Sequence, residues 1–193
     1  MKARHLIPLA VFLAIVVFLA IGLGRDPRVL PSPLIGKPVP EFSLAAMGPQ
    51  DSRLKVAAGP APATFSPSSL SGRPWVLNIW ASWCAECINE HPVLMQWQRE
   101  PRLADIPLVG IGYKDKPTAG LEWLQRHGNP FWVVASDENG QAGMNLGVYG
   151  VPETLIMDAR GVVRYRHVGP LTMQILNNKL VPLLEQLERE TKS

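Results

Sequence analysis

The chain contains two cysteines, Cys84 and Cys87, with two residues between them. A structural disulfide stabilises a protein mainly by closing a long loop in the unfolded chain, so a bond over this spacing would add little stability. Two thiols held this close are better suited to form and break a bond with each other. The pair therefore predicts thiol–disulfide exchange, with no cofactor beyond the redox-active disulfide itself.

Zinc and haem are the competing interpretations of a Cys-x-x-Cys pair. Structural zinc usually needs four ligands, and the sequence has no second cysteine pair; His91 alone would leave the site incomplete. Covalent haem attachment needs a histidine directly after the second cysteine, where this chain has Ile88. We therefore expect no bound metal.

The elements around the cysteines favour unequal roles for them. An apolar run at residues 75–81 reads as a buried strand, and a helix is expected from about residue 84 to 99, with a kink at Pro92. Free N–H groups and the helix dipole stabilise a thiolate at a helix N-terminus. We expect Cys84 to be the nucleophile and Cys87, one turn further along, to resolve the mixed disulfide.

The rest of the chain alternates between strand-like and helix-like segments. We expect strands at 108–113 and 131–135, helices at 118–127 and around 141–146, a hairpin of strands 154–158 and 162–168, and a closing helix at 171–190 interrupted at Pro182. This order predicts an α/β fold with a mixed central sheet flanked by helices. A Cys-x-x-Cys pair in that setting is typical of the thioredoxin fold.

The N-terminal part predicts export and membrane attachment. Residues 6–24 contain no charged side chain and follow Lys2 and Arg4. A membrane span needs about 20 apolar residues, whereas a signal-peptide core has about 7–15, so we expect a retained anchor at 6–24. The alternative is cleavage near residues 20–22. The basic residues place segment 1–5 in the cytoplasm by the positive-inside rule.

The exported part then divides into a proline-rich tether at 25–40 and a thioredoxin-like domain at 41–193, which would lie in the periplasm. Within it, residues 47–69 are rich in Ala, Pro, Gly and Ser and predict an irregular connection or a loop-rich hairpin. The net charge is +3, and no basic cluster occurs beyond Lys2 and Arg4, which argues against nucleic-acid binding.

Several segments resemble membrane-tethered thioredoxin-like proteins of cytochrome c maturation, the CcmG/DsbE family, which is related to the TlpA/ResA-like thioredoxins. These segments are 34–40 (LIGKPVP), 80–92 (WASWCAECINEHP), 113–115 (YKD), 128–130 (GNP), 147–154 (GVYGVPET) and 164–167 (RYRH). They extend over most of the exported chain. The 147–154 and 164–167 segments are more specific than the cysteine pair alone.

The resemblance implies reduction of the disulfide in apocytochrome c, which frees its CxxCH thiols for haem attachment. Apocytochrome c or haem-delivery proteins would be the partners, and a membrane-embedded thiol–disulfide transducer would supply electrons. The resemblance also implies that Pro152 is cis and lies beside the cysteines, where it exposes backbone groups to an extended peptide.

Three other side chains are candidate site residues. Glu90 matches an acidic residue of the family and lies on the helical face of Cys87, where it is either the acceptor of the Cys87 proton or an ordinary solvated residue. Trp83 is expected to contribute to a peptide-binding surface. Glu153, beside Pro152, either shapes an acidic recognition groove or is an ordinary solvated residue.

One departure from the family leaves the redox potential open. Family members usually carry a proline between the cysteines, whereas this chain has Ala85 and Glu86. The carboxylate of Glu86 should raise the pKa of Cys84, while the helix terminus lowers it. An oxidase or isomerase of exported proteins is therefore an alternative. A copper chaperone is a second alternative, although such proteins usually separate their cysteines by three residues.

Overall fold

The computed structural model describes residues 6–23, 33–48 and 64–192, in two units, Met1–Pro31 and Ser32–Ser193. The first unit contains helix α1 (Leu6–Leu23), whose sequence carries no charge. Among the residues described, no helix is both long and apolar enough to cross a membrane. The predicted cytoplasmic segment 1–5, residues 25–32 of the predicted tether and residues 49–63 of the predicted loop lie outside the described residues. Residues 33–40, the rest of the predicted tether, instead belong to the second unit, because Pro38 forms a bridge with Val162 and Val39 is buried.

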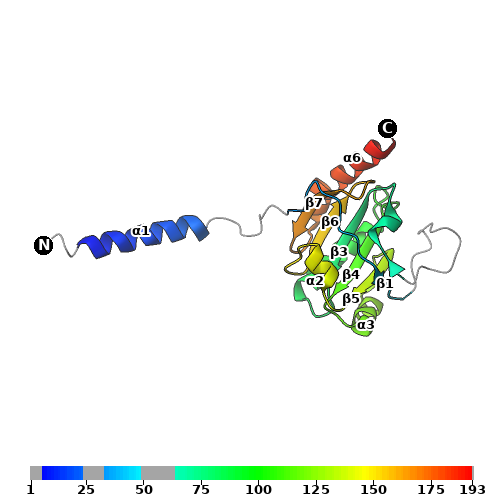
Figure 1. Cartoon of the computed structure of the whole chain (residues 1–193), viewed down its shortest axis with the longest axis horizontal. Helices are drawn as coiled ribbons and strands as arrows, with labels where there is room; N and C mark the ends of the chain where they lie inside the picture. Colours follow the sequence, from blue (N-terminus) through cyan, green and yellow to red (C-terminus); the bar gives the residue numbers. More distant parts are fainter. Residues whose placement is uncertain (1–5, 24–32, 49–63, 193) are drawn as a thin grey trace. The chain divides into compact units, whose positions relative to one another are not determined.

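The second unit is built on a mixed sheet of five strands (Figure 1). The strands are β3 (Trp75–Trp80), β4 (Leu108–Tyr113), β5 (Val133–Asp137), β6 (Glu153–Met157) and β7 (Val163–Val168), arranged in the order β5-β4-β3-β6-β7. β3 and β5 run parallel to β4, while β6 runs antiparallel to both β3 and β7. This is the predicted thioredoxin-like α/β fold.

Both faces of the central strand β3 are covered by other parts of the unit, and all six of its residues are buried. Side chains alternate across a strand, so Val76 and Trp80 contact one core cluster and Leu77 and Ile79 the other. The first cluster includes residues of α2 (Ala85–Trp97), α3 (Pro117–His127) and α6 (Val181–Lys192). The second includes Val39, Phe65 and Leu70 from the N-terminal part of the unit, and Leu146 and Val148, which follow α4 (Gln141–Asn145).

A short hairpin covers the outer edge of the sheet at β5. Its strands are β1 (Leu44–Ala45) and β2 (Thr64–Phe65), and the 3-10 turn η2 (Pro67–Leu70) follows. Ala46 forms an antiparallel bridge with Ala135 of β5, and the Met47 N–H donates to the Val134 carbonyl at 2.7 Å. The described ends of segment 47–69 thus agree with the loop-rich hairpin, which protects a strand edge that would otherwise be exposed.

Two predicted elements differ from the structure. The strand expected at 131–135 is Val133–Asp137, because the Phe131 N–H donates to the Asn129 side chain while Asp137 pairs with Tyr113. The closing helix is divided into α5 (Met173–Ile175), the π-helical turn η3 (Leu176–Leu180) and α6. The irregular turn therefore lies before Pro182 and not at it, since proline lacks the N–H that would continue the ladder and crowds the preceding turn.

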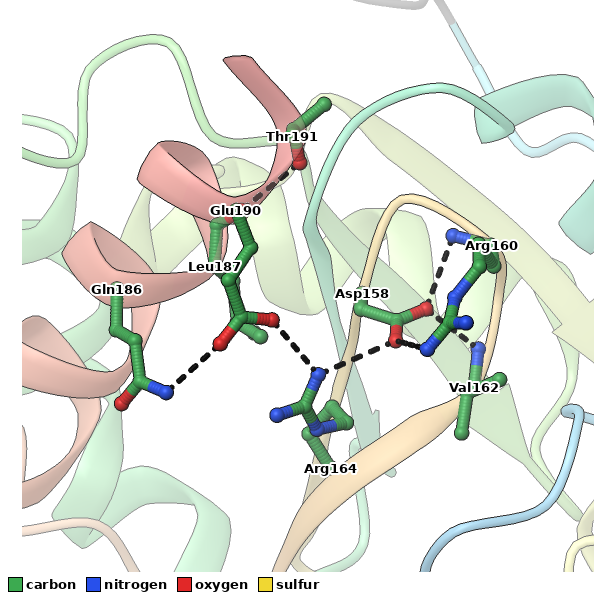
Figure 2. Close-up of polar contacts among 8 residues, drawn as sticks. All are labelled: Asp158, Arg160, Val162, Arg164, Gln186, Leu187, Glu190 and Thr191. Atoms are coloured by element: carbon green, nitrogen blue, oxygen red, sulfur yellow. Dashed lines mark hydrogen bonds and ion pairs between the residues drawn. The ribbon is translucent and has the colours of Figure 1, made fainter. Parts of the chain in front are cut away.

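The β6–β7 turn is tied to α6 by an ionic network (Figure 2). The Asp158 carboxylate accepts from the N–H groups of Arg160 at 2.9 Å and Val162 at 3.0 Å. Arg164 Nη1 lies 3.3 Å from Asp158 and 3.0 Å from Glu190 of α6. The register passes from Ile156–Tyr165 to Met157–Val163, so Arg164 is the additional residue of a β-bulge, which redirects its side chain toward α6.

Candidate active site

Cys84 occupies the N-cap of helix α2, as the sequence predicts. Strand β3 ends at Trp80, and Cys84 follows after three intervening residues. The Cys84 Sγ accepts a hydrogen bond from the Cys87 N–H at 3.1 Å. The two cysteines form a disulfide with a Cα–Cα distance of 5.3 Å, so the structure shows the oxidised state. Both are buried, Cys84 to 6% exposure and Cys87 to 2%. The free N–H groups of α2 are therefore placed to stabilise a Cys84 thiolate after reduction.

The loop before β6 lies directly against Cys84. The Val151–Pro152 peptide bond is cis, as the resemblance implies, and Pro152 is buried. The carbonyl oxygen of Val151 is 3.6 Å from the Cys84 Sγ. The segment that resembles the cytochrome c maturation family is thus brought onto the sulfur that would attack a substrate.

Glu90 is fully buried beneath the disulfide, so the interpretation as a solvated helix residue is wrong. One carboxylate oxygen accepts from Asn78 Nδ2 and the other from the Leu171 N–H, each at 2.9 Å. Burial raises the pKa of Glu90 to about 7, although both hydrogen bonds act to lower it. Glu90 and Cys87 line one small interior void, which has no room for a water molecule.

Glu153 is also fully buried, and this corrects its expected place in a surface groove. Its carboxylate forms an ion pair with Arg166 of β7, whose side chain is only 4% exposed. Burial raises the pKa of Glu153, and the charge of Arg166 reduces that effect. An incoming peptide therefore cannot contact the Glu153 carboxylate, which instead contacts the loop beside Cys84.

The residues before Cys84 are held by the loop after β4. Asp115 accepts two hydrogen bonds from Ser82, from its N–H at 2.6 Å and from its hydroxyl at 3.0 Å. The indole N–H of Trp83 donates to the Lys114 carbonyl at 3.0 Å, while the side chain of Trp83 stays 59% exposed. Trp83 is thus a fixed but accessible aromatic surface next to the nucleophile, as its candidate role requires.

Three contributors to the site do not follow from the sequence reasoning: Asn78, Asp115 and Arg166. Asn78 is a polar residue inside an otherwise apolar strand, and that break in the pattern is a signal for a buried polar partner. Asp115 and Arg166 lie in segments that resemble the family, but nothing local shows that they bond to Ser82 and Glu153.

His91 does not face the cysteines as a metal ligand would. Its Nε2 lies 3.2 and 3.1 Å from the carbonyl oxygens of His127 and Gly128, which only an N–H can satisfy. It therefore joins the active-site helix to the end of α3. Within residues 6–23, 33–48 and 64–192, no group of three or more His, Cys, Asp or Glu side chains is arranged to hold a metal ion.

A mixed sheet with a disulfide at the N-cap of a helix and a proline loop against its first sulfur defines a thioredoxin-like thiol–disulfide oxidoreductase. The comparisons agree with this class. The Redoxin family profile matches residues 34–180. Solved structures of a secreted thiol-disulfide isomerase from Corynebacterium glutamicum and a thiol-disulfide oxidoreductase from Bacteroides fragilis share the fold, with TM-scores of 0.59 and 0.60 at 18% and 21% identity. They cover 76% and 77% of this chain, and 85% and 100% of their own.

Relatives named DsbE match almost the whole chain. The thiol:disulfide interchange protein DsbE of Pseudomonas aeruginosa is 39% identical, over 100% of this chain and 98% of its own. DsbE of Escherichia coli K12 is 38% identical, over 96% and 95%. The chain therefore belongs to the DsbE family of thiol:disulfide interchange proteins and acts in thiol–disulfide exchange.

Proposed function

We propose that this protein reduces the disulfide of apocytochrome c before haem attachment, from the periplasmic side of the inner membrane. The main support is the loop at residues 147–154, which resembles the cytochrome c maturation proteins and lies against the Cys84 sulfur. The identity with DsbE proteins along nearly the whole chain adds to it.

The reaction follows from the unequal positions of the two cysteines. In the reduced protein, the Cys84 thiolate attacks one sulfur of the substrate disulfide, forms a mixed disulfide and releases the other substrate sulfur as a thiolate. Cys87 then attacks the Cys84 sulfur, which re-forms the Cys84–Cys87 disulfide and releases the second substrate sulfur. Two electrons pass to the substrate, whose thiolates take up two protons. A membrane-embedded thiol–disulfide transducer would reduce the enzyme again.

We assign to Glu90 the role of accepting the Cys87 proton before Cys87 attacks. A carboxyl group with a pKa near 7 is suited to exchange protons with a thiol near neutral pH. Both side chains line one interior void, which supports a transfer between Cys87 and Glu90 in the reduced protein.

Trp83 and the backbone beside Pro152 are the proposed contacts for the substrate peptide. Trp83 is exposed next to Cys84, and its indole N–H is fixed by Lys114, so little side-chain freedom would be lost on binding. The carbonyl oxygen of Val151 lies 3.6 Å from the Cys84 Sγ and would accept a hydrogen bond from the backbone of an extended peptide.

The decisive experiment combines a reduction potential with a substrate assay. The reduced full-length protein, in detergent, is mixed with a disulfide-bonded CxxCH peptide of apocytochrome c, and the free peptide thiols are quantified. We expect fast reduction and a low potential. A high potential, with oxidation of reduced peptides, would instead indicate the oxidase or isomerase that the missing active-site proline leaves open.

We also propose that residues 6–24 anchor the protein in the inner membrane. The support comes from the sequence: residues 6–24 form one uncharged, mainly apolar run whose length approaches the about 20 residues of a span, and basic residues precede it. Fractionation of cells should recover the protein with membranes and resistant to extraction at high salt. Recovery of a soluble form whose N-terminus begins near residue 23 would show cleavage and contradict the anchor.

A further inference from the structure

A buried arginine holds the loop that faces Cys84. Arg166 donates from Nη2 to the Gly147 carbonyl at 2.8 Å and from Nη1 to the Leu146 carbonyl at 3.4 Å. Both carbonyls lie just beyond the end of α4, where helix carbonyls have no intrahelical partner. One planar guanidinium therefore fixes the first residues of the loop.

The ion-pair partner of Arg166 fixes the next part of the same loop. Glu153 pairs with Arg166, and its carboxylate also accepts from the Tyr149 N–H at 3.4 Å. The ion pair thus contacts the carbonyls of residues 146 and 147 and the N–H of residue 149. Two residues further on is Val151, whose carbonyl lies 3.6 Å from the Cys84 sulfur.

The same arginine supports an aromatic ring at the surface. The Arg166 guanidinium carbon lies 5.3 Å from the centre of the Tyr149 ring, a distance typical of a cation–π contact. The Tyr149 side chain nevertheless remains 63% exposed. Arg166 therefore orients both the backbone beside the sulfur and an accessible ring two residues before it.

Stability alone does not account for this pair. Replacing a buried ion pair with apolar side chains is often neutral or stabilising, so folding gives no general reason to keep charges here. Placement of the loop gives such a reason. The planar guanidinium donates to two carbonyls at once, in a geometry that an apolar side chain or a lysine cannot reproduce.

We propose that Arg166 is a positioning residue for peptide substrates. Through Glu153 and the 146–150 segment, it sets the Val151 carbonyl and the Tyr149 ring against which an extended peptide is held while Cys84 attacks its disulfide. A small disulfide needs access to the sulfur alone and does not depend on this alignment. The proposal rests on the thiol–disulfide exchange activity and not on the identity of the client.

The test compares two substrates with the reduced full-length protein in detergent: a synthetic peptide closed by a Cys-x-x-Cys disulfide, and oxidised glutathione. Arg166→Lys keeps the positive charge but loses the bidentate contact. We expect its rate constant with the peptide to fall by about 10-fold to 100-fold, as misplacement of reacting groups does, while the rate constant with glutathione stays within about twofold.

Arg164→Lys is the matched control, because it changes an arginine of the same strand that contacts Asp158 and Glu190 instead. Both of its rate constants should match those of the unaltered protein. Tyr149→Leu is the second variant, and it keeps the proposal testable if Arg166→Lys does not fold. Tyr149 is exposed, so this substitution should leave the fold intact. It should show a smaller loss with the peptide and none with glutathione.

Equal losses with the peptide and glutathione in Arg166→Lys would mean that the pair only maintains the fold. No loss with the peptide, or no loss in Tyr149→Leu where Arg166→Lys cannot be prepared, would also overturn the proposal.

Discussion

The β6–β7 hairpin carries an ionic group at each end, and the two groups behave in opposite ways. Next to the cysteines, the Glu153 and Arg166 side chains are 0% and 4% exposed, and burial raises the pKa of Glu153. At the far end, Arg164 and Glu190 are 29% and 44% exposed (Figure 2). There, burial of Asp158 acts to raise its pKa, but hydrogen bonds from Val162, Arg160 and Arg164 outweigh it and the pKa is lowered.

The difference shows that similar ion pairs can have different roles in one hairpin. At the far end, Arg164 and Glu190 are partly exposed, so water screens their ion pair and it adds modestly to the attachment of α6. Beside the cysteines, two carboxylates, Glu90 and Glu153, are kept where burial opposes their ionisation. Perturbed carboxylates of this kind gather at functional sites, where their placement matters more than their contribution to stability.

The largest expected difference between the two ends is in exchange itself. Cys84→Ser should abolish disulfide reduction, and Cys87→Ser should accumulate mixed disulfides with the substrate, because the nucleophile is retained without its resolver. Non-reducing electrophoresis and mass spectrometry measure both outcomes. Arg164→Lys, at the far end, should retain full activity. If Cys84 were the less readily alkylated thiol in the reduced protein, the two roles would have to be exchanged.

Glu90→Gln should change the pH dependence of stability. The pKa of Glu90 rises from 4.5 to about 7 on folding, which corresponds to about 3 kcal/mol of unfolding free energy. This contribution is fully present below pH 4.5 and is lost as the pH rises through about 7.

Urea denaturation of Glu90→Gln at pH 5 and pH 8 should therefore show a smaller loss of stability with rising pH than the unaltered protein. The amide cannot accept from both Asn78 and the Leu171 N–H, and the lost hydrogen bond costs the variant about 1 kcal/mol at either pH. At pH 8 this cost is offset, because the variant places no ionised carboxylate in the interior. The same variant should resolve mixed disulfides more slowly. An unchanged pH dependence would mean that Glu90 is ionised as readily in the folded as in the unfolded chain.

Asp158→Asn tests the far end and should have the opposite sign. Because the pKa of Asp158 is lowered from 3.8, its contribution is present above that pH and is lost as the pH falls through the folded-state pKa. The variant should lose about 1 kcal/mol near neutral pH, where the ionised carboxylate accepts its hydrogen bonds, and less at strongly acidic pH. Denaturation at pH 7 and pH 2.5 measures both, and exchange activity should be unaffected. A loss of activity would contradict the separation of the two ends.

Glu86→Gln is expected to have the smallest effect. Glu86 lies exposed in the first turn of α2, where its carboxylate accepts from Asn89 at 3.5 Å. Removing a negative charge near the Cys84 thiolate should lower the pKa of that thiol and raise the reduction potential slightly. Added salt should reduce the difference between the two proteins. An unchanged Cys84 pKa would show that the carboxylate points away from the thiolate.

The sequence predicts those parts of the site that depend on local order. Cys84 lies at the helix N-terminus because a buried strand and a short turn precede it, and Glu90 lies on the face of Cys87 because of helical spacing. Contacts between distant segments were beyond this reasoning. The partner of Glu153 follows from the pairing of β6 with β7, and Ser82 meets Asp115 only once β3 and β4 are aligned.

The two arginines of β7 show why such contacts are difficult to predict. Arg164 and Arg166 are two residues apart, so a regular strand would place them on one face with similar surroundings. The bulge at Arg164 breaks that alternation, and one arginine contacts α6 while the other is buried beside Glu153. A bulge is set by the register of both strands, which a single strand's sequence does not specify.

The hydrogen bond from the Leu171 N–H to Glu90 makes this backbone amide a spectroscopic probe of the Glu90 carboxyl group. This amide is 81 residues from Glu90 in sequence and directly precedes the segment that leads into α5. Its proton is held 2.9 Å, donor to acceptor, from a carboxylate whose pKa is about 7. In an NMR titration of the native, isotope-labelled chain, the Leu171 amide resonance would therefore follow the ionisation of Glu90 without any substitution near the disulfide.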